Sequence, residues 1–260
     1  MSTMLHASPV FGPVHSRRLG VSLGINLLPG DGKVCTFDCI YCECGLNAER
    51  RPKSKLPTRD EVREALARKL AAMQAEGVKP DVLTFAGNGE PTAHPQFAQI
   101  MDDTIALRDR YFADAKISVL SNGTMVWRDD VREALMRVDT NIQKLDTVNA
   151  DYVAMVDRPQ QTTYDIDKVV DDLCRFDGHV VVQTMFLDGT LEDGTPVCNT
   201  GEEYVQPWID AVLKIRPERV MIYTIDRDTP LPTLRKASPE AMNSIAERLR
   251  KEGLEVTVSV

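Results

Sequence analysis

Four cysteines lie close together in the segment VCTFDCIYCEC, and the first three are spaced like ligands of one metal centre. Cys35, Cys39 and Cys42 form a C-x-x-x-C-x-x-C arrangement, which follows an expected strand and a DGK turn. A loop with this spacing can wrap three thiolates around one iron–sulfur cube, in which thiolates hold the iron. Only three cysteines belong to the pattern, so the sequence predicts a cluster with one iron left open for an outside ligand.

The same segment permits a second metal hypothesis, because Cys44 could join the other three thiolates in a tetrahedral zinc site. Zinc cysteines usually come as two separated pairs, however, and zinc would leave a downstream glycine–glutamate motif without a role. Cys44 could instead be a spare thiol beside a cluster. The other two cysteines stand apart. Cys174 falls in the apolar segment VVDDLCRF, where a small buried hydrophobic residue is expected, and Cys198 falls in an expected loop.

Polar motifs follow the next two expected strands. In TFAGNGEPT the two glycines would let the backbone approach a ligand more closely than a Cβ would allow. The alternative interpretation of this segment is a tight turn followed by a glutamate on the surface. In VLSNG an ordinary Asn-Gly turn is the alternative to a ligand site. The candidate residues of these two motifs are Gly87, Asn88, Gly89, Glu90, Ser121 and Asn122.

Charged and polar side chains also interrupt later, otherwise apolar strands. The two-residue period of a strand places Lys144 and Asp146 of QKLD on one face. Burying such groups unpaired costs on the order of several kcal/mol, so they should face a lumen and meet a ligand or partner, or form a structural salt bridge. By the same argument Gln183 in VVVQTMF should face a ligand or substrate. Tyr223 in MIYTID could be an ordinary core aromatic.

The cysteine segment, with Tyr41 directly before the third cysteine, resembles the C-x-x-x-C-x-aromatic-C loop of radical SAM enzymes. The resemblance extends from residue 9 to about residue 235, through PVHSRRLGVSLGINLLP, GNGEP, SNGT, QKLDT and VMIYTIDR. The cysteine loop and the glycine–glutamate motif are its most specific parts. Within the superfamily, the chain resembles a branch of small bacterial proteins similar to the enzymes that form the wyosine base of tRNA.

This resemblance implies two cofactors, a 4Fe-4S cluster on the three cysteines and S-adenosylmethionine on the open iron. It implies that residues 87–90 bind the methionine amino group, although Asn88 replaces the second glycine of the family motif. It places Ser121 and Asn122 near the methionine carboxylate or ribose, and Tyr223 near adenine. Lys144 is the candidate catalytic residue. The expected cofactor-binding residues are Tyr41, Gly87, Asn88, Gly89, Glu90, Ser121, Asn122, Asp146, Gln183 and Tyr223.

The order of the expected elements predicts an α/β fold with a parallel sheet. From about residue 80 short β-rich runs alternate with helical stretches, which is typical of βα units. The helices have recognisable ends: Thr58 and Glu61 form a capping box, and a later helix begins after Ser238 and stops at Gly253. Together with the resemblance, this pattern predicts a partial (β/α)6 TIM-like barrel of the radical SAM type. We expect one domain over residues 1–260, with a core at about 20–235 and packed extensions at 1–19 and 236–260. Its expected strands are SLGINLL, DVLTFAG, AKISVLSNG, TNIQKLD, HVVVQTMFL, RVMIYTID and LEVTVSV.

Composition restricts the partners of the protein. The 31 basic and 39 acidic residues give a net charge of −8, which repels phosphate backbones, so bulk nucleic-acid binding is not favoured. The basic segment RRPKSKLPTR is a local exception, and a solvated loop face is its simplest interpretation. Neither a membrane span nor a secretory signal is expected, which predicts a cytoplasmic protein without a membrane partner.

These observations lead to one functional hypothesis with alternatives. We expect a radical SAM enzyme that cleaves S-adenosylmethionine reductively, gives a 5′-deoxyadenosyl radical, and abstracts hydrogen from an unidentified substrate. Flavodoxin or ferredoxin is the expected electron donor. A radical SAM activase of a partner protein, an enzyme that modifies a tRNA base and a zinc-binding module are the alternatives. Synthesis of the wyosine base itself is not expected, because residues 1–34 contain no cysteine for a second cluster.

Overall fold

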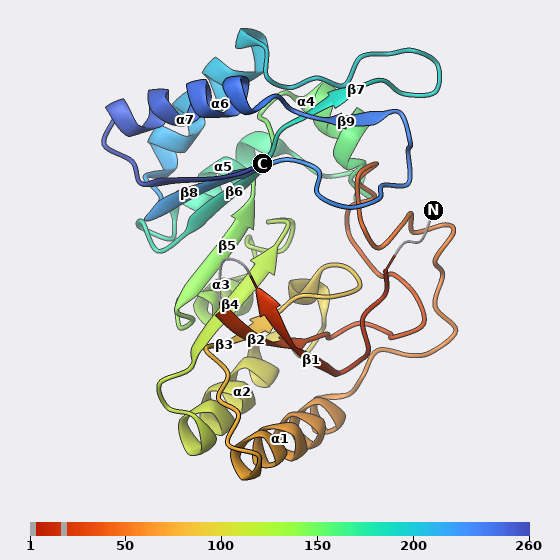
Figure 1. Ribbon diagram of the computed structural model, residues 1–260, viewed down its shortest axis with the longest axis vertical. Coiled ribbons are helices and arrows are strands. Elements are labelled where there is room, and N and C mark those ends of the chain that lie inside the picture. Colours follow the sequence, from red (N-terminus) through yellow and green to blue (C-terminus); the bar gives the residue numbers. More distant parts are fainter. Residues whose placement is uncertain (1–3, 17–19) are drawn as a thin grey trace.

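The computed structural model describes residues 4–16 and 20–260 of the chain, and its centre is an eight-stranded sheet (Figure 1). The strand order is β1-β2-β3-β4-β5-β6-β8-β10, and every neighbouring pair except β1 and β2 is parallel. A short antiparallel pair, β7 and β9, lies outside this sheet. The strands are β1 (Val10–Ser16), β2 (Gly20–Ile25), β3 (Val82–Phe85), β4 (Lys116–Ser121), β5 (Thr140–Lys144), β6 (Val181–Met185), β7 (Leu187–Gly189), β8 (Arg219–Tyr223), β9 (Leu234–Lys236) and β10 (Val256–Ser259).

Helices follow most of the parallel strands and cover the outer face of the sheet. In Figure 1, α1 and α2 lie at one end of the curved sheet, and α6 and α7 lie at the other. None of the helices formed by residues 4–16 and 20–260 has the length and apolar character needed to cross a bilayer. The helices and helical turns are α1 (Arg59–Ala75), η1 (Pro91–Ala93), α2 (Phe97–Tyr111), α3 (Asp129–Leu135), α4 (Ala150–Tyr152), η2 (Val153–Asp157), α5 (Ile166–Cys174), α6 (Glu202–Ile215) and α7 (Pro239–Lys251).

The α/β class and the partial-barrel arrangement predicted from the sequence are confirmed, since all seven predicted strands are present in one parallel order. The predicted capping box at Thr58 and Glu61 is formed, and Ser238 caps α7 as expected. The sequence did not predict β1. Its Gly12-Pro13 pair interrupts a strand pattern, but an edge strand tolerates proline, because the missing N–H need not face a partner.

The two ends of the chain contribute to the sheet in different ways. The N-terminal strand β1 adds at one edge, antiparallel to β2, with an irregular register between Phe11 and Val14. At the other edge, β10 pairs in parallel with β8, and α7 packs on both strands. The segment expected as a C-terminal extension is therefore part of the main sheet. Of the expected N-terminal extension, residues 1–3 and 17–19 lie outside the described residues.

The two faces of the sheet differ in polarity, and this difference positions the site. The outer face joins the helices in a large apolar core that includes Leu83, Phe85 and Val119. The inner face carries small and polar side chains, such as Ser22 and Thr84, whose hydroxyl oxygens lie 2.8 Å apart. Parallel strands end at the same edge, so polar side chains near their carboxyl ends converge inside the curve of the sheet.

Candidate functional site

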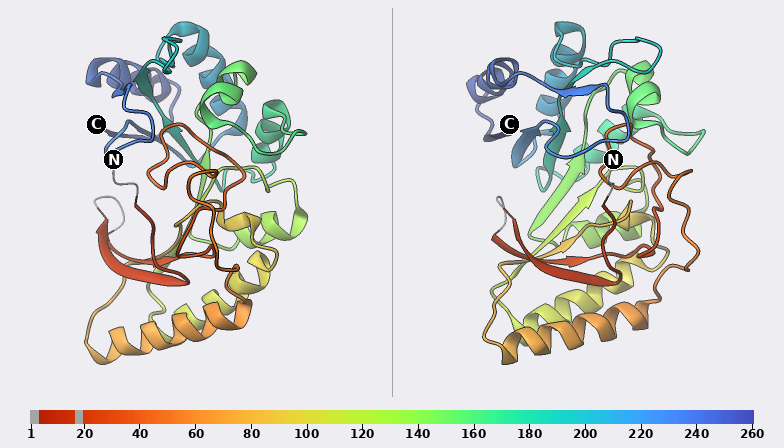
Figure 2. Two further views of the ribbon diagram at one scale, coloured as in Figure 1. Left: turned by 90° about the vertical axis from the view of Figure 1, so that its right-hand side faces the viewer. Right: turned by 45° about the vertical axis from the view of Figure 1, so that its right-hand side comes forward.

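The three cysteines of the predicted cluster lie in one long loop between β2 and α1. Its start is tied to the loop after β3, where Val34 N donates to Asn88 O at 2.9 Å and Glu90 N donates to Val34 O at 3.2 Å. Its middle is tied to η2 after β5, where Ile40 N donates to Val156 O at 2.9 Å. Figure 2 shows the loop, in orange-red, beside the green segment that contains η2. Backbone hydrogen bonds thus hold the cysteine loop at the carboxyl ends of two strands.

All three thiols are free and share one electrostatic environment. Cys39 is buried, whereas Cys35 and Cys42 are half-buried. Burial, the nearby Glu90 carboxylate and Cys42 raise the pKa of Cys35 to about 12. Burial and the charge of Asp157 also raise the pKa of Cys39, and both other thiols add to that effect. Within the described part of the chain, no three His, Cys, Asp or Glu side chains form a ready-made metal-ligand set.

Cys44 lies in the same loop, and its thiol has two neighbours, Gly87 O and Cys42. Its buried thiol lies 3.5 Å from Gly87 O, in the motif after β3. A hydrogen bond from Cys44, together with the positive charge of Lys33, lowers the pKa of Cys42 despite burial, and the pKa of Cys44 is raised in turn. Cys44 therefore supports the thiolate form of Cys42. The other two cysteines lie elsewhere, Cys174 beside Lys214 O and Cys198 beside Thr200.

The glycines of the motif after β3 are required by close contacts within the protein. A Cβ on Gly89, whose φ is +137°, would lie 1.9 Å from Val34 O. A Cβ on Gly87, whose φ is +143°, would lie 2.6 Å from the side chain of Asn26. The sequence predicted that these glycines let the backbone approach a ligand closely. In the structure, the space beside them is occupied by Val34 of the cysteine loop and by Asn26, the residue after β2. Replacing either glycine would push these segments apart.

Asn88 uses its side chain to hold the N-terminal segment. Its Nδ2 donates to His6 O at 2.9 Å and to Pro29 O at 2.8 Å, and its Oδ1 accepts from His6 N at 2.8 Å. The residue is fully buried. This arrangement explains why asparagine stands at a position where the family has glycine. The side chain of Asn88 is thus directed toward the N-terminal segment, and only its backbone lines the cysteine loop.

Glu90 and Asn122 link the motifs after β3 and β4. The buried Glu90 carboxylate accepts hydrogen bonds from Thr92 N at 2.9 Å and from Asn122 N at 2.6 Å. Burial raises the pKa of Glu90, although these hydrogen bonds and one with Ser121 lower it. The Nδ2 atom of Asn122 lies 2.8 Å from Thr36 Oγ1 and 3.6 Å from Cys35 Sγ. These polar groups therefore surround one side of the cysteine loop.

Lys144, Asp146 and Tyr41 meet in a buried network at the end of β5. Lys144 Nζ lies 2.6 Å from Asp146 Oδ2 and 2.7 Å from Asp157 Oδ1. The Tyr41 hydroxyl donates to Asp146 and lies 3.4 Å from Asp157 Oδ1. Burial lowers the pKa of Lys144, but the two carboxylates outweigh it and hold that pKa well above its usual range. Lys144 is therefore an ammonium ion between two acids.

The remaining predicted residues occupy the neighbouring inner strands. Lys144 and Gln183 are register partners on β5 and β6, and Met185 on β6 is paired with Tyr223 on β8. Tyr223 packs at the edge of an apolar cluster that includes Ile40 and Met185. The inner wall next to the cysteine loop thus changes from polar at β5 to apolar at β8.

Sequence reasoning missed two residues of this region, Lys33 and Asp157. Lys33 stands two residues before the first cysteine, and its place in the DGK turn directly before the cysteine motif was the available signal. Asp157 lies at the end of η2, next to Arg158 with its left-handed φ of 51°, and belongs to no recognisable sequence motif. Its Oδ1 lies 3.5 Å from Cys39 Sγ.

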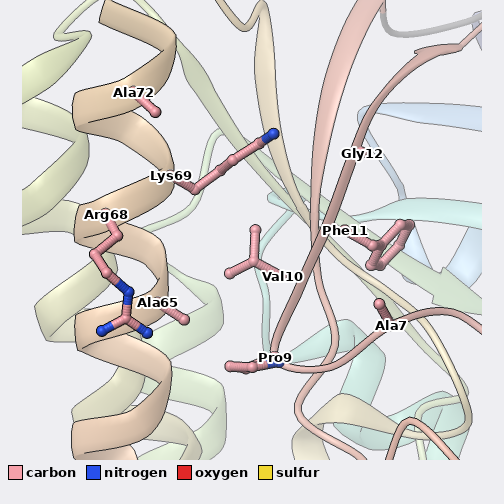
Figure 3. Close-up of a pocket in the computed structure, with 9 residues that line it drawn as sticks. All are labelled: Ala7, Pro9, Val10, Phe11, Gly12, Ala65, Arg68, Lys69 and Ala72. Carbon is pink, nitrogen blue, oxygen red and sulfur yellow. The ribbon is translucent and has the colours of Figure 1, made fainter.

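An open groove elsewhere on the molecule does not belong to this site (Figure 3). It lies between β1 and α1, where Pro9 and Val10 point toward the helix, Lys69 reaches toward the strand, and Phe11 points to the other side of β1. None of the predicted cofactor-binding residues lines it. Its lining residues are Ala7, Pro9, Val10, Phe11, Gly12, Ala65, Arg68, Lys69 and Ala72.

Comparison with protein families agrees with this geometry. The model of the radical SAM superfamily matches residues 31–195, which include the cysteine loop and β3 to β6. The chain belongs to the radical SAM superfamily. The cofactors of this family are a 4Fe-4S cluster and S-adenosylmethionine, and they are the cofactors of this chain. The family resemblance inferred from the cysteine spacing is confirmed, and the cluster is favoured over the zinc alternative.

The names of two relatives that are similar in sequence do not state a radical SAM substrate. The chain is 30% identical to a protein named GTPase Obg of Brachyspira hyodysenteriae, over 92% of this chain and 33% of that protein. It is 29% identical to a UPF0026 protein of Methanocaldococcus jannaschii, over 74% of this chain and 58% of that protein. The chain thus spans between a third and three fifths of these two relatives.

Solved structures share the fold at low sequence identity. SuiB of Streptococcus suis bound to S-adenosylmethionine superposes with a TM-score of 0.62 and 13% identity, over 90% of this chain and 50% of that chain. TYW1 with a lysine–pyruvate adduct gives a TM-score of 0.60 and 12% identity, over 88% of this chain and 73% of that chain. These similarities confirm the partial barrel.

Proposed function

We propose that this radical SAM enzyme holds its 4Fe-4S cluster through Cys35, Cys39 and Cys42 and cleaves S-adenosylmethionine reductively. When bound, the cluster and S-adenosylmethionine supply a 5′-deoxyadenosyl radical that abstracts hydrogen from a substrate. The observation that carries the proposal is the set of three free thiols on one loop, fastened by backbone hydrogen bonds to the Gly87–Glu90 motif. Three thiolates suit iron–sulfur ligation, and the fourth cysteine, Cys44, is directed at Gly87 O.

The polar groups beside the cysteine loop fit the charged methionine end of S-adenosylmethionine. We propose that the backbone of Gly87, Asn88 and Gly89 and the carboxylate of Glu90 receive the ammonium group. Asn122 would orient the carboxylate or ribose, because its amide already lies between Thr36 Oγ1 and Cys35 Sγ. Ser121 would support this arrangement through Glu90.

The inner strands would receive the rest of the cofactor and the substrate. Tyr223 and the apolar cluster beside it suit an adenine ring, while Tyr41, Asp146 and Gln183 border the polar part of the wall. Lys144 is held protonated by two carboxylates, so it would act through its charge and its hydrogen bonds. A lysine that forms a carbonyl adduct must be neutral when it attacks, and these carboxylates oppose that state. The adduct seen in TYW1 therefore gains no support at Lys144.

The charge of the chain bears on the class of substrate. The fold is compatible with hydrogen abstraction from a small molecule, from a glycyl or other residue of a protein, or from a tRNA base. The net charge of −8 disfavours a broad surface for binding nucleic acid. We propose a low-potential donor of the flavodoxin or ferredoxin class as the source of the electron, in the cytoplasm.

The decisive experiment is anaerobic incubation of the reconstituted protein with S-adenosylmethionine and dithionite. We expect 5′-deoxyadenosine and methionine in equal amounts, and neither product from Cys39→Ala. Cys174→Ala is the matched control and should retain the reaction. A wild-type protein that contains a complete cluster but yields no 5′-deoxyadenosine would contradict the proposal.

A further inference from the structure

The basic segment at residues 50–59 lies on the outer side of the cysteine loop and has no part in the cofactor site described above. Its ten residues include five cations and no acid, in a chain whose net charge is −8. Figures 1 and 2 show this segment, in orange, running along the outside of the molecule from the cysteine loop to α1. Its charge is therefore opposite in sign to that of the chain as a whole.

Backbone contacts fasten the basic segment to the turn that begins the cysteine loop. Arg50 O accepts from Lys33 N at 2.7 Å. Asp31 Oδ2 accepts from Lys53 N at 3.0 Å. A Cβ on Gly32 would lie 2.5 Å from Arg50 O, so the two stretches of chain are in direct contact. The fold thus fixes the position of the basic segment relative to the cysteine loop.

One turn of chain separates the basic segment from the first candidate cluster ligand. Asn47 Nδ2 donates to Cys35 O at 3.2 Å. Arg50 N donates to Leu46 O at 3.1 Å, which closes the turn that contains Asn47. Because the segment runs along the outside of the molecule, a protein bound there would be close to the cysteine loop without entering the barrel.

Three cations of the segment are available to a partner. They are exposed, and none of them forms an ion pair with residues 4–16 or 20–260. The fourth cation, Arg59, is held by Asp103 through two hydrogen bonds of 2.6 and 2.8 Å. The fifth, Arg50, directly follows Glu49, which offsets its charge. The three exposed cations, called the basic patch below, are Arg51, Lys53 and Lys55.

The acids at the other end of the segment are engaged with partners of their own. Asp60 Oδ1 lies 2.9 Å from Arg63 Nη2. Glu61 forms the capping box of α1 with Thr58. These acids therefore leave the basic patch without a neutralising side chain.

An open hollow beside the basic patch gives this face a shape that a partner can fill. Its volume is about 600 Å³, and Lys55 of the patch lines it together with the half-buried Leu56 and Pro57. Pro29 and Gly30, which precede the cysteine loop, line it as well. Protein interfaces combine an apolar centre with a polar rim, and weak electron-transfer complexes have the smallest interfaces. The face has this anatomy on a small scale.

We propose that the basic patch docks the low-potential electron donor through an acidic face of that protein. The inference rests on the proposed function, because reductive cleavage of S-adenosylmethionine requires such a donor. In the docked complex the donor passes one electron to the cluster and is itself oxidised by one electron, and no bond forms or breaks. Opposite charges steer two proteins together and select the docking face, and electron transfer requires that this face be close to the cluster.

Nucleic acid is the other polyanion that a basic patch could meet. Holding RNA through its phosphates requires a broad basic surface, whereas this patch offers three free cations on a chain with a net charge of −8. The charge distribution therefore favours the acidic face of a protein.

The experiment measures the association of labelled bacterial flavodoxin, and separately of bacterial ferredoxin, with the reconstituted full chain at increasing salt concentration. The wild-type chain should bind at least one of them. The triple variant Arg51→Gln, Lys53→Gln, Lys55→Gln removes three charges but no backbone hydrogen bond. At low ionic strength its association rate constant should be about tenfold lower than that of the wild type. The difference should disappear at about 1 M salt, where the screening length is about 3 Å.

A second triple variant controls for net charge. Lys79→Gln, Lys168→Gln, Lys251→Gln removes the same charge from exposed positions between α1 and β3, on α5 and at the end of α7. This variant should associate with the donor as the wild type does. Both triple variants should contain as much iron as the wild type, since none of these side chains is a candidate cluster ligand.

Four outcomes would overturn the inference. The wild type could bind neither donor, the patch variant could associate as fast as the wild type, or both triple variants could lose association equally. The patch variant could also lose affinity for tRNA while it keeps its affinity for the donor, which would make the patch a nucleic-acid site. Failure of the proposed function is recognised separately, because the wild type would then form no 5′-deoxyadenosine with dithionite, a small reductant that needs no docking face.

Discussion

The Cys39 thiol donates to Asp157 Oδ1 at 3.5 Å, and this contact joins the cysteine loop to the turn that follows β5. Asp157 is also 2.7 Å from Lys144 Nζ, so one carboxylate contacts both a candidate cluster ligand and the candidate catalytic residue. Burial raises the pKa of Asp157 to about 6, with Lys144 opposing the shift and Asp146 adding to it. We therefore expect cluster binding at Cys39 and the positions of Asp157 and Lys144 to depend on each other.

The first prediction concerns the cluster ligands. Replacing Cys35, Cys39 or Cys42 by alanine should abolish cluster binding, because each variant would keep only two of the three candidate ligands. Cys174→Ala should bind a normal cluster, since its thiol lies on α5 beside Lys214 O. Iron content and visible absorbance of the four reconstituted variants check the prediction. A normal cluster in Cys39→Ala would disprove the ligand assignment.

The second prediction concerns Glu90 and the affinity for S-adenosylmethionine. A charge-assisted hydrogen bond to the cofactor's ammonium group contributes roughly 1.5–3 kcal/mol, so Glu90→Ala should weaken binding by about ten- to a hundredfold. Titration of the reconstituted protein measures this change, and the cluster itself should persist.

A matched pair of variants controls for the structural role of Glu90. Glu90→Gln removes the charge and keeps one of the two acceptor oxygens, so it can accept from Thr92 N or from Asn122 N but not from both, and it should bind the cofactor weakly. Glu133→Ala, on the exposed face of α3, should bind normally. Wild-type affinity in Glu90→Gln would show that the carboxylate serves the turn and not the ligand.

The third prediction concerns the buried charges at the end of β5. Lys144→Met should destabilise the protein by about 3–5 kcal/mol, because it leaves Asp146 and Asp157 buried together without their cation. Adding Asp157→Asn should recover part of that loss, since one of the two like charges is then removed. The free energies of unfolding in urea, measured for both single variants and the double variant, give the coupling. Strict additivity would contradict the network.

Much of this arrangement could be predicted from the sequence, because it depends on local spacing. The cysteine triplet, the glycine–glutamate motif and the seven parallel strands each have a pattern that is independent of distant residues. The role of Asn88 could not be predicted, because its partners His6 and Pro29 are far away in the sequence. Asp157 was missed for the same reason: only the packing of η2 against the cysteine loop brings it to Cys39.

The fourth prediction separates close packing from backbone strain at a glycine. Gly89→Ala should unfold the cysteine loop or prevent cluster binding, since its Cβ would lie 1.9 Å from Val34 O. Gly194 also has a positive φ, +86°, but nothing lies within 4 Å of its added Cβ. Gly194→Ala should therefore cost only about 1–2 kcal/mol of stability and keep the cluster. Equal effects of the two substitutions in urea unfolding and iron content would refute the packing argument.

The last prediction is that this chain binds one cluster and not two. The three cysteines outside the triplet lie in different surroundings: Cys44 contacts Gly87 O, Cys174 is beside Lys214 O, and Cys198 is beside Thr200. Thiolates must surround one cube to hold it, and these three thiols are directed at separate parts of the fold. Reconstitution should therefore give about four irons and about four sulfides per chain, as expected for a single 4Fe-4S centre. The triple variant Cys44→Ser, Cys174→Ser, Cys198→Ser should give the same values, although Cys42 loses the hydrogen bond from Cys44. About eight irons per wild-type chain, falling to about four in the triple variant, would show that these cysteines gather around a second cluster and would disprove the prediction.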